Sequence, residues 1–147
     1  MIYLLTGQPG AGKTTIGKLL VDYFKDKDKN IIQIDGDELR CIFPNVDYSE
    51  IGRRKNIEKA HDIAYFLDQK GFDVVISLIS PYRDLRDLLK FKTSVIEIYV
   101  YTTEIRGREE YFVENYEPPI TDFLDIDTTN ISDAHYILDK ILYIIKK

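Results

Sequence analysis

One glycine-rich stretch near the start of the chain constrains the fold more than any other feature. Residues 7–15 read Gly-Gln-Pro-Gly-Ala-Gly-Lys-Thr-Thr, which matches the pattern G-x-x-x-x-G-K-S/T in full. The apolar run 2–6 before it predicts a strand, and the pattern over 13–25 predicts a helix. Glycines allow the backbone to curl so that N–H groups point inward, and the helix adds the positive end of its dipole. The stretch therefore predicts a strand, a phosphate-binding loop (the P-loop, residues 7–15) and a helix.

The side chains of the P-loop predict which ligands it takes. Lys13 supplies a mobile cation to the β- and γ-phosphates of a nucleoside triphosphate, and the Thr14 hydroxyl can bind the Mg²⁺ that bridges them. We therefore expect ATP and Mg²⁺ as cofactors, with Thr14 as the protein's metal ligand. The cofactor-binding residues expected from the P-loop are Gly7, Gly10, Ala11, Gly12, Lys13, Thr14 and Thr15.

Short apolar runs alternate with helical patterns along the rest of the chain. Strands are expected at 2–6, 31–35, 73–80, 95–101 and 123–127, and helices at 13–25, 49–69, 82–90, 104–112 and 132–145. Ser132 is the expected N-cap of the last helix. This alternation predicts an α/β protein of the P-loop NTPase fold, a five-stranded parallel sheet with helices on both faces. Since we find no repeat and no linker, one domain is expected over 1–147.

Composition narrows the classes of function. A net charge of -5 argues against a general nucleic-acid binder, because that role needs a large positive field. Cys41 is the only cysteine, which excludes an intramolecular disulfide and a zinc site built from cysteines. The sequence has neither a recognisable secretory signal nor a run long enough to span a bilayer. We expect a soluble cytoplasmic protein whose partners include neither nucleic acid nor membrane.

A second polar cluster follows the strand at 31–35. Asp35 and Asp37 stand at its carboxyl end, which is where parallel sheets bind ligands. Their carboxylates can reach a γ-phosphate, its magnesium or an acceptor hydroxyl, and Arg40 can hold an acceptor anion. The alternative is a polar turn that caps a short helix. Because the P-loop is expected next door, we assign catalytic roles to Lys13, Asp35 and Asp37.

Since the chain is acidic, an anionic ligand must meet a local group of cations. The candidates are Lys13, Arg40, Arg53, Arg54, Lys59, Arg83, Arg86, Arg106 and Arg108, and for each one alone a solvated surface position is the alternative. On the helix at 49–69, one face carries Arg53, Asn56 and Lys59, either as an anion-binding wall or as a solvated stripe. Ser80 is expected as a helix N-cap or as a substrate contact. His61 and His135 are both expected as ordinary half-buried helix residues.

These motifs together resemble the adenylylsulfate kinases, which phosphorylate the ribose 3'-hydroxyl of adenosine 5'-phosphosulfate. The resemblance runs from Ile2 to about Tyr101, through the P-loop, the Asp-Gly-Asp at 35–37, the Tyr-Ser at 48–49 and the Ile-Ser-Pro-Tyr-Arg at 79–83. It implies an ATP-dependent phosphotransferase in which Asp37 lies near the acceptor hydroxyl, as base or orienting group. It implies that Tyr48 takes the place of an aromatic that stacks on the acceptor base. The substrate-binding residues expected are Asp37, Arg40, Tyr48, Arg53, Asn56, Ile79 and Ser80.

The chain departs from the family after Tyr101. Members usually carry an Arg-Asp-x-Lys-Gly-Leu-Tyr lid, whereas this chain has no clear counterpart of the lysine and shortens to Glu-Pro-Pro at 117–119. Arg106 and Arg108 are expected to close over ATP as cationic groups. The altered lid leaves the acceptor open between adenosine 5'-phosphosulfate, which we place first, and cytidine diphosphoramidate, the acceptor of related enzymes in capsule pathways.

Two further classes of function stay open. A nucleotide-dependent switch usually needs a guanine-reading Asn-Lys-x-Asp motif, which the sequence lacks. A kinase of a non-nucleotide metabolite would keep the P-loop and the aspartates but would need no stacking group at Tyr48. The shortened lid region leaves room for a homodimer.

Overall fold

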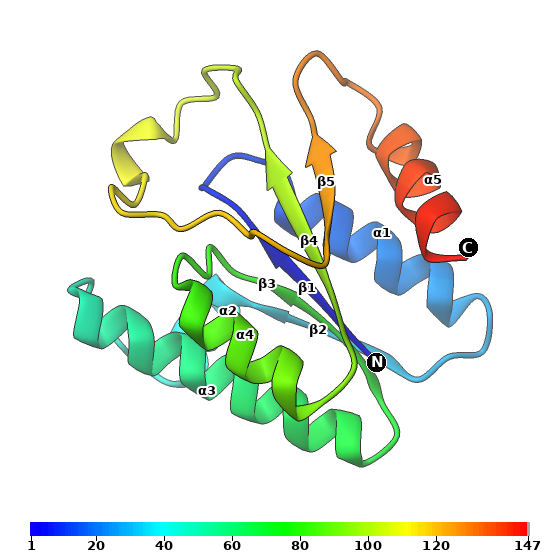
Figure 1. Cartoon of the computed structure of the whole chain (residues 1–147), viewed down its shortest axis with the longest axis horizontal. Helices are drawn as coiled ribbons and strands as arrows, with labels where there is room; N and C mark the ends of the chain where they lie inside the picture. Colours follow the sequence, from blue (N-terminus) through cyan, green and yellow to red (C-terminus); the bar gives the residue numbers. More distant parts are fainter. Residues whose placement is uncertain (147) are drawn as a thin grey trace.

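The fold is built on one parallel sheet (Figure 1). The computed structural model describes residues 1–146. Within them, β1 (Ile2–Thr6), β2 (Ile31–Asp35), β3 (Asp73–Ser77), β4 (Val95–Tyr101) and β5 (Phe123–Asp127) form a 5-stranded sheet in the order β2-β3-β1-β4-β5. Every adjacent pair is parallel. Parallel neighbours need crossover connections, and these carry the helices onto the faces of the sheet.

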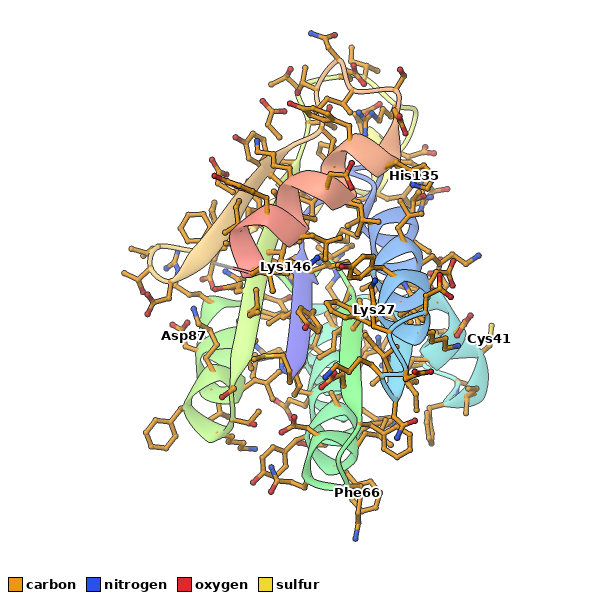
Figure 2. The ribbon with its side chains drawn as sticks, turned by 90° about the vertical axis from the view of Figure 1, so that its right-hand side faces the viewer. Lys27, Cys41, Phe66, Asp87, His135 and Lys146 are labelled. Atoms are coloured by element: carbon orange, nitrogen blue, oxygen red, sulfur yellow. The ribbon has the colours of Figure 1, made fainter. Side chains whose placement is uncertain are left out.

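Helices cover both faces of the sheet. α1 (Lys13–Lys25) and α5 (Ala134–Ile145) lie on one face and stand in the foreground of Figure 2. α3 (Glu50–Gln69) and α4 (Arg83–Lys92) lie on the other, and the short α2 (Gly36–Ile42) follows β2 directly (Figure 1). The predicted α/β fold and its parallel sheet are therefore confirmed. No helix within residues 1–146 is both long and apolar enough to cross a membrane.

The central strand β1 shows how the two halves of the core form. Tyr3 and Leu5 pack with α1 and α5, whereas Ile2 and Leu4 pack with α3 on the opposite face. All four side chains are buried, and full burial of such a side chain contributes roughly 1.5–3 kcal/mol. The continuous apolar run in the sequence thus reflects a strand that is covered on both faces.

The helix predicted over 104–112 is wrong. The structure has only a 3-10 turn, η1 (Glu109–Tyr111), in this region. Gly107 adopts a left-handed conformation with a φ of 83°, and the Glu109 carboxylate accepts hydrogen bonds from the backbone N–H groups of Arg106 (2.9 Å) and Gly107 (3.1 Å). The Glu109 carboxylate therefore stabilises a turn around the left-handed Gly107, where the predicted helix would need α-helical backbone.

Two predicted ends also move. The strand expected to run to residue 80 ends at Ser77, because the carbonyl of Ile79 accepts from the backbone N–H of Gly7 instead of continuing the ladder. The N-cap of α5 is Asp133 rather than Ser132, and the Asp133 carboxylate accepts from the N–H of His135 at 2.9 Å. The end of β3 thus lies three residues before the predicted end, and the N-cap of α5 lies one residue after the predicted N-cap.

Candidate active site

A cleft of about 890 Å³ opens at the carboxyl edge of the sheet. Its walls come from the P-loop, the start of α2, the first turns of α3, the segment after β3 and the segment at 108–113. The predicted site residues that line it are Gly10, Gly12, Lys13, Thr14, Thr15, Asp35, Asp37, Arg40, Tyr48, Arg53, Asn56, Ile79, Ser80 and Arg108. The predicted residues Gly7, Ala11 and Arg106 are not part of this lining. The fold thus brings together segments far apart in the sequence.

The P-loop conformation depends on its glycines. Gly7 has a φ of 155°, and a Cβ atom there would lie 2.1 Å from the carbonyl oxygen of Val100. Gly12 is the N-cap of α1 and is left-handed, with a φ of 106°. The N-terminus of α1 therefore faces the cleft, where its free N–H groups favour an anion.

Lys13 is the buried cation of the cleft. Its side chain is 8% exposed, and its ammonium donates to the carbonyl oxygen of Gln8 at 2.9 Å. The pKa of Lys13 is lowered to about 8, mainly by burial and then by the charge of Arg108, while Asp35 and Asp37 act in the opposite direction. An approaching polyphosphate would restore the charge that burial disfavours.

Thr14 and Asp35 form a pair of oxygen ligands beside this lysine. The Thr14 hydroxyl donates to one carboxylate oxygen of Asp35 at 3.1 Å. The other carboxylate oxygen caps α2 by accepting from the N–H of Glu38 at 3.4 Å, so the capping alternative describes part of the role of Asp35. Within the described chain, no group of three or more His, Cys, Asp or Glu residues is arranged to hold a metal. The pair fits Mg²⁺, which takes most of its ligands from phosphate and water.

The far end of the cleft is built on α2, α3 and the loop between them. The Arg40 guanidinium lies over the Tyr48 ring, 4.5 Å from its centroid, and donates to the carbonyl of Asn45. Asn45 in turn donates to the carbonyl of Gly52 at 2.9 Å, which ties this loop to α3. An arginine and an exposed aromatic ring are thereby presented together, an arrangement suited to an anion attached to a planar base.

The face of α3 is only partly an anion-binding wall. Arg53 and the buried Asn56 line the cleft, whereas Lys59 is exposed and lies over the ring of Phe43, 4.7 Å from its centroid. The lysines and arginines predicted to meet an anionic ligand therefore fall into two groups. Lys13, Arg40, Arg53 and Arg108 line the cleft, and the others contact protein groups outside it.

Ser80 differs from its predicted role as a helix cap. The N-cap of α4 is Tyr82, which makes no side-chain capping bond. Ser80 instead has a left-handed φ of 46°, is 1% exposed and leaves its hydroxyl without a hydrogen-bond partner. Its carbonyl accepts from the Thr6 hydroxyl at 3.1 Å and from Arg86. An unpartnered buried hydroxyl on a cleft wall fits a ligand contact.

A buried ionic network behind Ser80 was not predicted. Arg86 is fully buried and pairs with Glu97 at 2.7 Å, and Lys90 pairs with the other oxygen of Glu97 at 2.9 Å. Arg86 also donates to the carbonyls of Ser80 and Glu117. The sequence feature that could have indicated this network is Glu97, a lone charged residue in the otherwise apolar and aromatic run at 95–101.

The two arginines of the altered lid occupy different places. Arg106 donates to the carbonyls of Gly10 (3.1 Å) and Thr128 (2.8 Å) and pairs with Glu104 at 2.8 Å. It therefore supports the P-loop from outside the cleft. Arg108 is exposed and lines the cleft, with its Cβ atom 3.3 Å from the position that a Cβ on Gly10 would take.

Neither histidine lies in the cleft. His61 is buried in α3 rather than half-buried, and its Nε2 atom has no hydrogen-bond partner. Burial lowers the pKa of His61 to about 4, so the ring is neutral at neutral pH. His135 is exposed at the start of α5 rather than half-buried, and Cys41 is exposed on α2 at the edge of the molecule (Figure 2).

The sheet order and the glycine loop define an α/β protein of the P-loop NTPase fold, as predicted. The family model for adenylylsulphate kinases matches residues 1–111, and the chain belongs to this family. The resemblance drawn from the sequence motifs is therefore confirmed.

Relatives in this family are named for two different kinase activities. Cytidine diphosphoramidate kinase from Campylobacter jejuni is 40% identical over 100 residues, which cover 67% of this chain and 59% of that protein. Adenylyl-sulfate kinase from Burkholderia ambifaria is 34% identical over 100 residues, covering 65% and 55%. A probable adenylyl-sulfate kinase from Aeropyrum pernix is 27% identical over 161 residues, covering 93% and 88%. The chain thus spans little more than half the length of the first two relatives.

Solved structures agree with the fold. The Mycobacterium tuberculosis APS kinase CysC in complex with AMPPNP and APS has a TM-score of 0.83 at 17% identity, covering 99% of this chain and 97% of that one. A gluconokinase from Sinorhizobium meliloti has a TM-score of 0.67 at 15% identity, covering 96% and 89%. At these identities the likeness shows the fold alone.

Proposed function

We propose that this chain transfers the γ-phosphoryl group of ATP to the ribose 3'-hydroxyl of a nucleotide that carries a small anionic head group. The observation that carries the proposal is the composition of the single cleft described above. Lys13 and Thr14 lie at its phosphate-binding end, and Arg40 with Tyr48 lie on a different wall. Family membership supports a phosphotransferase with this arrangement of ligands.

In the proposed reaction, the acceptor oxygen forms a bond to the γ-phosphorus while the bond from that phosphorus to the β,γ-bridging oxygen breaks. ADP leaves, and the hydroxyl proton passes to Asp37 or to the transferred phosphoryl group. Asp37 is exposed in the first turn of α2 and lines the cleft, which suits a group that orients this hydroxyl. Lys13 and the N-terminus of α1 hold the phosphates in position. Mg²⁺, held by Thr14 with Asp35 beside it, would neutralise phosphate charge.

Adenosine 5'-phosphosulfate is the first candidate acceptor, because the family and most of the relatives above carry that activity in their names. Cytidine diphosphoramidate is the second, because the relative with 40% identity is named for it. Both ligands combine a flat base with a small anionic group, which suits Tyr48 and Arg40. We also propose that the protein acts in the cytoplasm; a homodimer stays a prediction.

The first test is a coupled ADP-release assay with ATP and Mg²⁺, comparing adenosine 5'-phosphosulfate, cytidine diphosphoramidate and no acceptor. ADP release that depends on one compound is expected and names the acceptor. If neither compound stimulates release while ATP still binds, the proposed acceptor class is wrong, and a switch or another acceptor becomes the better hypothesis.

Replacing Asp37 with Asn tests the assigned chemistry. Turnover is expected to fall by about 10²–10⁴-fold with the Kd for ATP unchanged, because the change removes a proton acceptor but no phosphate contact. Asp22→Asn, on the exposed side of α1, serves as the matched control. Normal turnover by Asp37→Asn would contradict the role given to Asp37.

Replacing Tyr48 with Ala tests whether the acceptor has a base. The acceptor KM is expected to rise by about tenfold or more with little change for ATP, because stacking on an aromatic ring contributes roughly 1–3 kcal/mol. Tyr136→Ala serves as the matched control, because it removes a tyrosine on α5 that is equally exposed and does not line the cleft. An unchanged KM in Tyr48→Ala would favour a non-nucleotide acceptor.

A further inference from the structure

One wall of the cleft is made by a segment with almost no regular structure. Tyr111, Phe112 and Val113 line the cleft, and they belong to residues 107–115, which we call the wall segment. Its only regular element is the 3-10 turn η1. Figure 1 shows this part of the chain in yellow, beyond the carboxyl end of β4 and beside the P-loop. Something other than secondary structure must therefore hold it in place.

Gln8 provides that attachment. Its side-chain Nε2 donates to the carbonyl oxygen of Val113 at 2.8 Å, and its Oε1 accepts from the N–H of Val113 at 2.9 Å. Within residues 1–146, these are the hydrogen bonds that join the wall segment to the rest of the chain; the other bonds of the segment are internal or run to Arg106. Val113 is 5% exposed, so water does not readily replace them.

The same residue contacts the phosphate-binding lysine. The backbone carbonyl of Gln8 accepts from the Lys13 ammonium at 2.9 Å, while its side chain holds Val113. Gln8 therefore links the cation that meets ATP to the wall opposite α2 and α3. The side-chain amide supplies, on two atoms of one group, both the donor and the acceptor that Val113 uses.

We propose that Gln8 is a positioning residue that holds the wall segment against the P-loop and thereby shapes the acceptor end of the cleft. The assignment of this end to an acceptor rests on the proposed function. The P-loop pattern leaves position 8 free, since phosphate binding uses backbone N–H groups there. Gln8 thus has a function in this chain that the motif does not demand.

The test compares Gln8→Leu and Gln8→Glu with Gln69→Leu, an exposed position at the end of α3. Leucine removes both bonds, and glutamate replaces the donor with an oxygen that faces the Val113 carbonyl. Hydrogen exchange of the peptide covering 107–116 is measured by mass spectrometry without ligand. The Kd for a non-hydrolysable ATP analogue and the acceptor KM are measured on the same proteins.

Exchange in the wall segment is expected to become about tenfold faster in both Gln8 variants and to stay unchanged in Gln69→Leu. Leucine removes both hydrogen bonds, whereas glutamate removes one and sets an oxygen against the Val113 carbonyl. The acceptor KM is expected to rise about tenfold. The Kd for the ATP analogue is expected to rise less than this, because Lys13 and the N-terminus of α1 still hold the phosphates while the wall segment carries Arg108. Unchanged exchange would overturn the attachment itself, whether or not any acceptor is turned over. Faster exchange with an unchanged acceptor KM, or with an equal loss of ATP affinity, would overturn the link to the acceptor end. An absence of acceptor-dependent turnover in the unmodified protein would refute the proposed function separately.

Discussion

The buried Lys13 ammonium predicts that ATP binding takes up protons. Its pKa is lowered to about 8, chiefly by burial. Contact with the phosphates of ATP raises this pKa again, so the bound lysine is fully charged over a range in which the free lysine is not. With a pKa of about 8 in the free protein, uptake is expected to be about 0.1 proton per nucleotide at pH 7, about 0.5 at pH 8 and about 0.9 at pH 9.

Calorimetric titration measures this quantity directly. A non-hydrolysable ATP analogue with Mg²⁺ is titrated in buffers of different ionisation enthalpy, and the slope of the observed heat gives the protons taken up. Phosphate itself titrates near pH 6, so it contributes little above pH 8. Affinity is expected to fall toward tenfold for each pH unit above the pKa.

Two variants isolate the effect. Lys13→Met should abolish the pH-dependent uptake, whereas Lys18→Met, an exposed position on the same helix, should leave it intact. Uptake that is flat from pH 7 to pH 9, or that persists in Lys13→Met, would refute the reasoning.

The lowered pKa of Lys13 also makes the free energy of unfolding of the nucleotide-free protein depend on pH. The folded pKa lies near 8 and the unfolded value is 10.5, so the unfolded chain binds more protons between these two pH values. The contribution of Lys13 to the free energy of unfolding therefore rises with pH across this window. Below pH 8 the buried charge costs on the order of 3 kcal/mol. Nucleotide-free Lys13→Met should accordingly be more stable than the unmodified protein at pH 7.

Two further predictions concern stability and are measured by denaturant unfolding. Gly7→Ala is expected to cost about 3 kcal/mol or more, because the added Cβ would lie 2.1 Å from the Val100 carbonyl oxygen; a loss below about 1 kcal/mol would mean that the P-loop can shift freely. Glu97→Gln is expected to cost about 3–5 kcal/mol, because it leaves the charge of the fully buried Arg86 uncompensated. Unfolding at the unmodified denaturant concentration would show that Arg86 finds another partner.

The sheet and the P-loop could be predicted because their signals are local. The P-loop motif fixes a strand, a turn and a helix within a few residues, and continuous apolar runs indicate strands buried on both faces. The carboxyl edge could then be located from the chain order alone, which places Asp35 and Arg40 beside the P-loop. Asn56, on a helix, is placed in the substrate site only by the resemblance to the family. All three line the cleft as expected.

The segment between β4 and β5 could not be predicted in the same way. Its conformation depends on Glu109 folding back on the backbone, on Arg106 reaching the P-loop and on Gln8 holding Val113. Gln8 and Val113 are 105 positions apart in the sequence, and no helical or strand period marks such a contact. The local pattern at 104–112 predicts a helix because it contains none of these long-range contacts.

The two ends of the cleft differ in how they are built, one from a local motif and the other from contacts between residues far apart in the sequence. This difference suggests how the preference for an acceptor could vary in this fold. The phosphate end of the cleft is made by one continuous stretch, in which Gly7, Gly10 and Gly12 adopt backbone conformations that residues with a side chain rarely take. The acceptor end is assembled from α2, α3, the turn at Ser80 and the wall segment, each held by its own side-chain contacts. A change in the wall segment or in Gln8 is therefore expected to reshape the cleft without disturbing the sheet. Under the proposed function, the wall segment is where we expect substitutions to alter the choice between an adenine and a cytosine nucleotide, the two kinds of acceptor for which relatives in this family are named.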